Sequence, residues 1–559
     1  MFIVSVNCDL DEALRTLGHE VRSLSLTKPG LHTLRSLLDE EREPDCILQK
    51  EHLGARVLFS DLATFSCIKA FWSIDTHLNY YWQRHYGRVF DAFFTPHPRY
   101  LTELTPAWLH PGTFRLPACG RDRHWTPHEQ RTQALSFVGR LTEDRTLRRN
   151  FCGTLRRCYQ VEPVDGLTHE QMMGLYDQTR IIPNESIAFE TNFRLLEGAS
   201  SGCCVISPFV GEDQDALLEP GKEILVYRDG LEFLHLVDQN LKHPDQAERI
   251  GLAARARIQA EHLPSHRAKS LVRALETLPR AAAHRAEAED HFAMALCLLS
   301  LNKALKLPDL EAFSKRVFHD RPADLLIRLL AAVGDSSLQK ARELVRQAKV
   351  LLAEAQTVTE YLKELAVACG GFALWAQNSA DARFFYDSYE TLNGRSSSCG
   401  NDCDCETLYG AWIDALILDG KHHSHGLQFE DGRCFSALDF ILQWANAKPQ
   451  DPAWACKLHA ESALCHRLPQ IVLTGMSRLR LHQPDSLETS IEYIHAALRM
   501  FNFPAAHGEY TSLIALAQNR GVEPQIHRLL RLRLPHSDLL SAVFPVGQLA
   551  DESKDGMLT

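Results

Sequence analysis

Two kinds of hydrophobic pattern divide this chain. Up to residue 278, short apolar runs alternate with amphipathic or polar stretches; over 282–545 nearly all signals are those of amphipathic helices. Short apolar runs bounded by polar turns predict buried strands, and their alternation with helical stretches predicts parallel sheets covered by helices. We therefore expect an α/β protein followed by an all-α region.

The first 120 residues have the pattern of a Rossmann-like lobe. Phe2–Val6 is predicted to be a buried strand and Asp9–Leu17 a helix, and Gly18 is predicted to turn the chain into a second strand. Further short strands are predicted at 45–48, 69–74 and 89–95. No Gly-x-Gly-x-x-Gly follows the first strand, which argues against a dinucleotide-dependent dehydrogenase.

A Pro- and His-rich segment from Pro106 to His128 interrupts this alternation. It is predicted to link the first lobe to a second α/β lobe, which begins at Leu135 and ends near Leu278. Ligands of such lobes bind at the carboxyl ends of the strands.

The region after Pro279 contains long amphipathic stretches, at 286–305, 336–355 and 357–368. Successive helices of this kind predict an α-solenoid, with a tetratricopeptide-like repeat as one candidate and a compact helical bundle as the alternative. The expected domains are residues 1–120, 121–279 and 280–559.

Composition and charge fit a soluble globular protein. The chain has 559 residues, of which 45% are hydrophobic and 23% charged, and its net charge of −11 argues against a dedicated nucleic-acid binder. No apolar run approaches the ~18 residues of a membrane-spanning helix. The sixteen cysteines are scattered and no signal peptide is recognised, so we expect reduced thiols and a cytoplasmic location.

Residues 192–207 combine a short helix with an apolar strand. The helix is predicted to begin with Asn192 as its N-cap, to carry Arg194 and Glu197 in its first turns, and to end at Gly202 with a positive φ angle. A helix N-terminus and an arginine attract phosphate, and a carboxylate accepts hydrogen bonds from sugar hydroxyls. This combination predicts a nucleotide-sugar site.

Several segments, in the same order, resemble motifs of the GT-B-fold glycosyltransferases. The E-G-A-S-S-G run at 197–202 is similar to the family's E-A-x-A-x-G, and F-V-G-R-L at 137–141 is similar to the loop that opens the donor lobe. Residues 219–227 and 229–234 resemble a later strand and helix start. The resemblance covers roughly residues 60–278 and is nearest to the group 1 branch that includes CgeB-type spore maturation proteins. It implies two Rossmann-like lobes facing a cleft, and a hexosyltransferase-type enzyme.

The resemblance also implies a diphosphate site in the second lobe. Gly139, Arg140 and Arg145 match the loop that grips the donor diphosphate, although Arg145 stands where the family usually has lysine. Positive charge there suits a leaving group that gains negative charge. The alternative is that these arginines are solvated and pair with Glu143 or Asp144.

Glu197 matches the second glutamate of the family's E-x7-E pattern, and the resemblance implies that it binds the nucleotide ribose. Phe189 occupies the place of the first glutamate, and Glu190 is one position out of register. This departure leaves open whether the reaction retains or inverts the sugar configuration. Asn192 and Arg194 complete the expected donor-binding set, while the alternative for Glu197 is capping or pairing on the helix surface.

On the first lobe, Asp75 and His77 follow a predicted strand and are the candidate catalytic residues. A glycosyl acceptor hydroxyl needs a general base, and either side chain can serve as one. Asp75 is the preferred base and His77 the second choice. Equally, either residue could cap the helix predicted at Leu78–Tyr86.

A zinc site is tempting at Cys399, Cys403 and Cys405, with the His-rich segment 422–425 nearby. The C-x3-C-x-C spacing matches no common zinc module, so a loop between helices is the preferred interpretation. The D-x-D of residues 402–404 lies in the helical region, away from the proposed site. No metal is expected, and no cofactor besides the nucleotide-sugar substrate.

The preferred function is transfer of a sugar from a nucleotide-sugar donor to a protein or glycan acceptor. The helical domain is expected to offer a surface for a protein partner; neither nucleic acid nor a transmembrane segment is expected. Two alternatives remain. One is a non-catalytic nucleotide-sugar-binding scaffold, and the other is a sugar-nucleotide epimerase.

Overall fold

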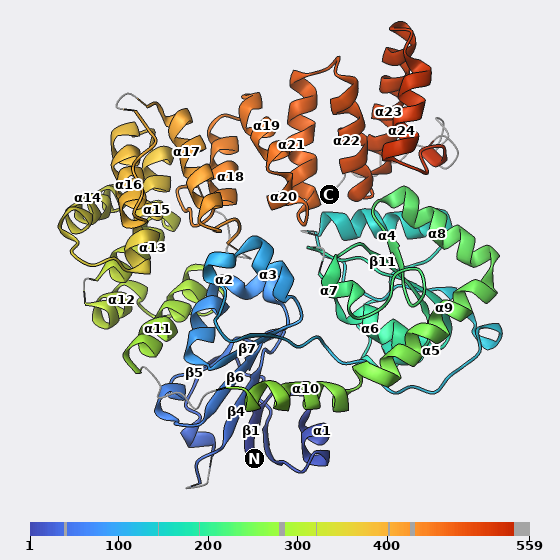
Figure 1. Cartoon of the computed structure of the whole chain (residues 1–559), viewed down its shortest axis with the longest axis horizontal. Helices are drawn as coiled ribbons and strands as arrows, with labels where there is room; N and C mark the ends of the chain where they lie inside the picture. The colour runs from blue at the N-terminus through green and yellow to red at the C-terminus, as the bar shows by residue number, and fades with distance from the viewer. Residues whose placement is uncertain are drawn as a thin grey trace. The chain divides into compact units, whose positions relative to one another are not determined.

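Two larger parallel sheets with covering helices, followed by a long run of helices, confirm the predicted fold class (Figure 1). The computed structural model describes residues 1–38, 42–143, 145–188, 190–278, 285–319, 321–400, 403–424 and 431–540. Contacts between elements define two compact units. One contains Met1–Pro117 and Pro264–Pro449, and the other contains Ala118–Leu263 and the residues from Gln450 on. The division into domains at residues 120 and 279 stays a prediction.

The first unit is built on a six-stranded parallel sheet in the order β2-β1-β4-β6-β7-β8. Its strands are β1 (Phe2–Val6), β2 (Glu20–Leu24), β4 (Cys46–Lys50), β6 (Ile68–Trp72), β7 (Ala92–Thr95) and β8 (Thr113–Arg115). Ile3 in β1 pairs with Val21 on one side and Cys46 on the other. All of β1 is buried, which explains its continuous apolar run. The strands predicted from residue 2 to residue 95 are therefore confirmed.

The predicted linker was wrong over part of its length. β8 lies within the segment from Pro106 to His128, and Phe93 of β7 pairs with Thr113 of β8. A strand of three residues is too short to give an alternating pattern, and its Pro- and His-rich flanks obscure it. The sequence analysis also missed a two-stranded parallel pair, β3 (Gly30–His32) with β5 (Val57–Phe59).

The helices of the first unit come from both ends of its sequence. They are α1 (Asp11–Thr16), α2 (Thr76–Tyr86), α3 (Pro98–Leu104), α10 (Pro264–Glu276), α11 (Arg285–Leu301), α12 (Leu310–Phe318), α13 (Pro322–Gly334), α14 (Leu338–Glu354), α15 (Glu360–Trp375), α16 (Ser379–Leu392), α17 (Cys405–Leu418) and α18 (Ala437–Ala447). α10 packs against α1, and α11 packs against α2 (Figure 1). The helical run therefore begins as part of the cover of the first sheet.

The second unit contains a four-stranded parallel sheet in the order β12-β11-β10-β9. Its strands are β9 (Gln133–Leu135), β10 (Thr179–Pro183), β11 (Cys204–Pro208) and β12 (Leu225–Tyr227). Its helices are α4 (Thr146–Tyr159), α5 (His169–Asp177), α6 (Phe193–Ser200), α7 (Glu212–Asp215), α8 (Gly230–Lys242), α9 (Pro244–Arg257), α19 (Pro452–Ala460), α20 (Ser462–Cys465), α21 (Pro469–His482), α22 (Leu487–Arg499), α23 (Phe503–Asn519) and α24 (Glu523–Arg533). Among the described helices, none has the length and hydropathy needed to cross a lipid bilayer.

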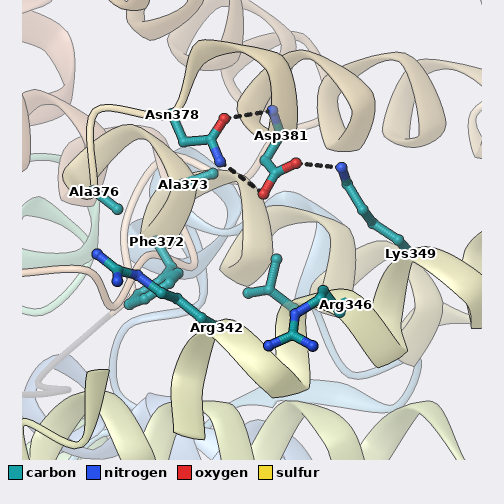
Figure 2. A pocket seen from close by; sticks show the side chains of 9 residues that line it. Arg342, Arg346, Lys349, Phe372, Ala373, Ala376, Asn378 and Asp381 are labelled. Carbon is teal, nitrogen blue, oxygen red and sulfur yellow. Dashed lines mark hydrogen bonds and ion pairs between the residues drawn. The ribbon is translucent and has the colours of Figure 1, made fainter. Parts of the chain in front are cut away.

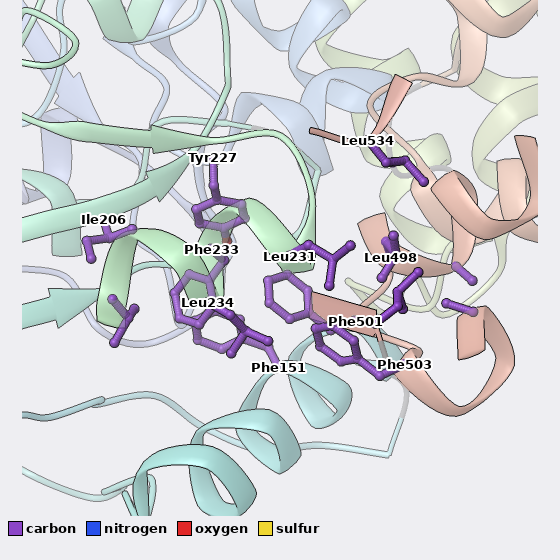
Figure 3. Close-up of a cluster of buried hydrophobic side chains, with 14 of the residues drawn as sticks. Phe151, Ile206, Tyr227, Leu231, Phe233, Leu234, Leu498, Phe501, Phe503 and Leu534 are labelled. Carbon is purple, nitrogen blue, oxygen red and sulfur yellow. The ribbon is translucent and has the colours of Figure 1, made fainter. Parts of the chain in front are cut away.

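One hydrophobic core joins the second sheet to the last helices of the chain (Figure 3). The Phe501 ring lies 5.0 Å from that of Phe151 and 5.4 Å from that of Phe233. A Cβ atom on Gly230 would lie 2.7 Å from the Phe503 ring, so α8 needs glycine at this contact. Burial of each large apolar side chain contributes about 1.5–3 kcal/mol. The helices α22–α24 are thus part of the same core as the sheet.

Candidate functional site

The predicted donor residues lie at the carboxyl edge of the sheet β9–β12. In a parallel sheet all strands end at one edge, where ligands commonly bind. Residues 136–145 lead from β9 to α4, and residues 184–192 lead from β10 to α6. Arg140, Arg145 and Asn192 are therefore placed at one edge, with Glu197 in the second turn of α6.

No described residue pairs with the guanidinium groups of Arg140 and Arg145. Arg140 is exposed and Arg145 half-buried, and neither guanidinium forms a hydrogen bond or ion pair with another described residue. The alternative partner Glu143 is exposed, and Asp144 lies outside the described residues. The loop itself is held by the Gly139 amide, which donates to the Val164 carbonyl at 2.9 Å. Two arginines are thus presented on a fixed backbone.

A buried ion pair stabilises this loop. Arg148 Nε donates to Glu185 Oε2 at 2.7 Å, and the two side chains are only 9% and 1% exposed. Arg148 Nη1 also donates to the Arg140 carbonyl at 3.2 Å. Because α4 supplies Arg148 and the loop directly after β10 supplies Glu185, the pair ties the arginine loop to the sheet. The sequence analysis did not single out either residue.

Arg194 is buried under the same loop. Its Nη2 donates to the Val138 carbonyl at 2.8 Å, its Nη1 donates to Asn184 Oδ1 at 2.7 Å, and its guanidinium lies 4.4 Å from the centre of the Phe137 ring. These contacts use the planar donor set of arginine within the protein. They favour a role for Arg194 in holding the loop, and phosphate binding by Arg194 stays a prediction.

Asn192 occupies the N-cap position of α6, as predicted, but its side chain does not cap. No capping hydrogen bond from a described amide reaches it; instead, its Nδ2 donates to the Glu185 carbonyl at 2.9 Å. This hydrogen bond directs the Asn192 side chain toward the loop after β10. Its Oδ1 atom is buried and has no hydrogen-bond partner among the described residues. This oxygen can accept a hydrogen bond from a ligand.

Glu197 is a mostly buried carboxylate. Its side chain is 12% exposed, and its Oε1 lies 3.4 Å from Nε2 of His169, the first residue of α5. Burial raises its pKa, and the nearby charges of His169, Arg194 and Arg121 oppose this rise. Neighbouring side chains therefore hold Glu197 in place, and its carboxylate can still accept hydrogen bonds from a ligand. The contact with His169 agrees in part with the alternative that Glu197 forms a pair on the helix surface.

Of the two residues at the place of the missing first glutamate, Phe189 and Glu190, the structure describes only Glu190. Phe189 lies outside the described residues. Glu190 is buried, and its Oε2 accepts from the Ala188 amide at 2.8 Å. Glu190 therefore stabilises its own loop.

The end of α6 is confirmed at Gly202. Its φ angle is +70°, and the Cys203 amide donates to the Gly198 carbonyl at 3.0 Å. A Cβ atom at Gly202 would lie 2.4 Å from the Trp125 ring. Glycine is thus required both for the backbone conformation and for the close approach of Trp125.

At the carboxyl edge of the first sheet, Asp75 lies beside a buried glutamate. Glu51 follows β4 and is 5% exposed; its Oε2 accepts from the amides of Ile74 and Asp75 at 2.7 and 2.9 Å. Its Oε1 accepts from Asn79 Nδ2 at 2.7 Å. Burial and the charge of Asp75 raise the pKa of Glu51, against the effect of these hydrogen bonds. Sequence reasoning missed Glu51, whose only signal is its place directly after a strand.

Asp75 occupies the N-cap position of α2, as the capping alternative placed it, but its side chain forms no capping hydrogen bond with the described amides of this helix. His77 lies in the first turn of α2, is 7% exposed, and packs against His97 with ring centroids 6.1 Å apart. The hydroxyl of the neighbouring Thr76 lies 2.7 Å from that of Ser73. Asp75 is therefore the more accessible of the two candidate bases.

The cysteines and histidines of the helical region do not form a metal site in the described part of the chain. No group of three or more His, Cys, Asp or Glu side chains is arranged there to hold a metal ion. All sixteen cysteines are free thiols, nine of them buried. Asp402 and His425 lie outside the described residues, and Asp404 caps α17 by accepting from the Thr407 amide at 2.8 Å.

Comparisons with known structures give likenesses of low identity. A glycosyltransferase from Rickettsia africae ESF-5 is 11% identical, with 49% of this chain and 97% of that chain covered and a TM-score of 0.34. Sucrose-phosphate synthase from Thermosynechococcus elongatus is 12% identical, with 49% and 98% covered and a TM-score of 0.36. No curated protein matches the sequence.

A family model described as "Glycosyl transferase-like" matches residues 131–273. The match contains the sheet β9–β12 and all six donor-site candidates: Gly139, Arg140, Arg145, Asn192, Arg194 and Glu197. Residues 131–273 are therefore similar to a glycosyl transferase-like domain, and Arg140 and Arg145, unpaired among the described residues, lie at the carboxyl edge of its sheet.

Proposed function

We propose that this protein is a hexosyltransferase that moves a sugar from a nucleotide-sugar donor to a protein or glycan acceptor. The observation that carries the proposal is the pair Arg140 and Arg145, whose guanidinium groups have no partner among the described residues at the edge of a glycosyl transferase-like domain. Two such groups suit a diphosphate, which gains negative charge as its bond to the sugar breaks.

The remaining donor contacts come from α6. Glu197 accepts hydrogen bonds from the ribose hydroxyls, a role supported by its fixed position beside His169. Asn192 Oδ1, buried without a partner among the described residues, accepts a hydrogen bond from a further hydroxyl of the donor. Arg194 is assigned to positioning: it holds Val138 and thereby the backbone that presents Arg140.

The acceptor is assigned to the first sheet, with Asp75 as general base and His77 as the second choice. The acceptor oxygen bonds to the anomeric carbon while the bond from that carbon to the donor phosphate oxygen breaks. The acceptor proton passes to the Asp75 carboxylate, and the nucleoside diphosphate leaves with the electron pair. The burial of His77 supports the choice of Asp75.

Three finer assignments belong to this proposal. The donor lobe belongs to the CgeB-like branch of the group 1 glycosyltransferases, the helical region is a tetratricopeptide-like array that docks a protein partner, and the protein acts in the cytoplasm. The motif order over residues 135–234 supports the first. The succession of helices from α11 to α24 supports the second.

The test is a donor panel on the full chain: thermal stabilisation by UDP, GDP, dTDP and CMP and by their sugars, with donor hydrolysis followed in parallel. We expect one base to stabilise the protein, by about 2.7 kcal/mol at a ligand concentration of 100 Kd. The stabilisation should be lost in Arg140→Ala and Glu197→Ala. Arg149→Ala removes an exposed charge from α4 and is the matched control, which should bind like the native chain.

The outcomes separate the alternatives. Specific binding with hydrolysis or transfer supports a transferase. Binding without turnover, even with acceptors present, supports a non-catalytic scaffold, and conversion of the donor to an epimeric nucleotide sugar supports an epimerase. Equal binding by Arg140→Ala and the native chain would contradict the assigned diphosphate site.

A further inference from the structure

The helical part of the first unit contains a pocket that the proposed reaction does not use. The pocket has a volume of about 470 Å³ and lies between α14, the end of α15 and the start of α16 (Figure 2). This volume is within the range of ligand-binding pockets, about 300–1,000 Å³. Its lining combines apolar side chains with three basic side chains, and also includes Asn378 and Asp381.

The positive charges lie on one face of α14. Arg342, Arg346 and Lys349 follow one another at spacings of four and three residues, which places them on the same side of a helix. Lys349 pairs with Asp381 at the start of α16, and the Asn378 side chain also donates to Asp381, at 2.8 Å. This lysine is therefore already neutralised inside the pocket.

The two arginines remain available to a ligand. Arg342 is exposed and forms no hydrogen bond or ion pair with another described residue. Arg346 pairs with Glu343 at 2.6 Å, but both side chains are exposed, 71% and 48%, and such a surface pair exchanges easily for a ligand carboxylate. Arginine binds carboxylates through two parallel N–H donors.

The floor of the pocket is apolar. Val345, Phe372 and Ala373 are buried and line it beside the arginines. A ligand with charged groups alone would make no apolar contact with this floor. A ligand with an acidic group next to an aliphatic or aromatic side chain would satisfy both halves of the lining.

We propose that this pocket binds an acidic peptide segment of a protein partner, with carboxylates on Arg342 and Arg346 and an apolar side chain on Phe372. The chain as a whole has a net charge of −11, so its overall field does not attract acidic peptides. Binding of an acidic peptide must therefore come from local charge, and this pocket supplies it. The proposal is independent of the transferase assignment, because it needs no donor and no turnover.

The test is fluorescence anisotropy on the full chain with a labelled, acetylated hexapeptide of four Glu and two Leu. We expect saturable binding that weakens about tenfold in Arg342→Ala and further in the double variant Arg342→Ala/Arg346→Ala. Arg316→Ala, which removes an exposed arginine of α12, is the matched control and should bind like the native chain. Unchanged thermal midpoints would show that these exposed substitutions leave the fold intact.

Peptide controls address the two halves of the pocket. Replacing Glu by Gln should abolish binding, and replacing Leu by Ser should weaken it several-fold. Equal affinity of the Gln peptide, or unchanged affinity in Arg342→Ala, would overturn the proposal. A polyglucuronate oligosaccharide that binds more tightly than the peptide at the same arginines would overturn the peptide assignment in favour of an acidic glycan.

Discussion

The carboxyl edges of the two parallel sheets differ in the sign and in the pairing of their charges. At the first sheet the central group is a carboxylate, Glu51, whose oxygens accept from two backbone amides and from Asn79. At the second sheet the loop after β9 carries Arg140 and Arg145, which have no partner among the described residues. Both oxygens of Glu51 are thus hydrogen-bonded at the first edge, while the second edge presents two arginines that are unpaired among the described residues.

The difference teaches that one architecture can prepare two kinds of site. Both edges are built from β-α units. At the first edge a buried carboxylate fixes the backbone by accepting hydrogen bonds, whereas at the second edge arginines that are unpaired among the described residues can bind an anion. The second edge also needs an internal scaffold, because Arg148, Glu185 and Arg194 hold the loop that carries these arginines. Four predictions test this contrast, and the largest effect comes first.

The first prediction concerns the base at the first edge. Asp75→Asn should lower the transfer rate by about 10²- to 10⁴-fold, because the amide cannot take the acceptor proton. Donor binding, assigned to the other sheet, should not change. Steady-state transfer and donor titration measure the two quantities, with Asp335→Asn, an exposed aspartate after α13, as control. Full transfer activity in Asp75→Asn would contradict the assignment of Asp75 as the general base.

The second prediction concerns the scaffold at the second edge. Arg148→Met should lower the free energy of unfolding by about 3–5 kcal/mol, because it leaves the buried Glu185 carboxylate without its ion-pair partner. Urea unfolding measures this change. Arg149→Met on the exposed face of α4 should have an effect within about 0.5 kcal/mol. Similar effects of the two substitutions would show that the buried pair does not support the loop.

The third prediction concerns Glu51. Its folded-state pKa is raised, so the folded state binds the proton more tightly than the unfolded state, and this contribution to stability is lost as the pH rises through the folded-state pKa. Glu51→Gln lacks this titration. We expect the variant to be about 1–3 kcal/mol less stable at acid pH and the difference to shrink as the pH rises through the folded-state pKa of Glu51. A difference that does not shrink with rising pH would contradict the raised pKa.

The fourth prediction concerns salt. Donor affinity should fall a few-fold between 0.05 and 0.5 M NaCl, because Arg140 is exposed and its attraction to phosphate is screened over a Debye length of about 10 Å at 0.1 M. The stability effect of Glu51→Gln should not change over the same range, since that network is buried. Isothermal titration and urea unfolding provide the two measurements, and an equal salt response at both edges would remove the contrast.

Local patterns predicted the elements of the sheets and the position of the candidate residues. Apolar runs identified β1, β4, β6 and β7, and the break at Gly202 identified the end of α6. Patterns of this kind failed for β8, because three residues carry too little periodicity. They also failed for the capping role of Asn192, whose side chain hydrogen-bonds to the Glu185 carbonyl, seven residues away.

The amino-acid sequence by itself determined most of the strands of the two larger sheets and which charged residues follow those strands, because both depend on neighbours within a few positions. Only the tertiary structure decided how those charges are used. Arg194 is held by a carbonyl 56 residues away, and Phe501 packs against Phe151 of the sheet's own helices. Such partners are distant in the chain, so burial and pairing, and with them the contrast between the two edges, appear only when the chain is folded.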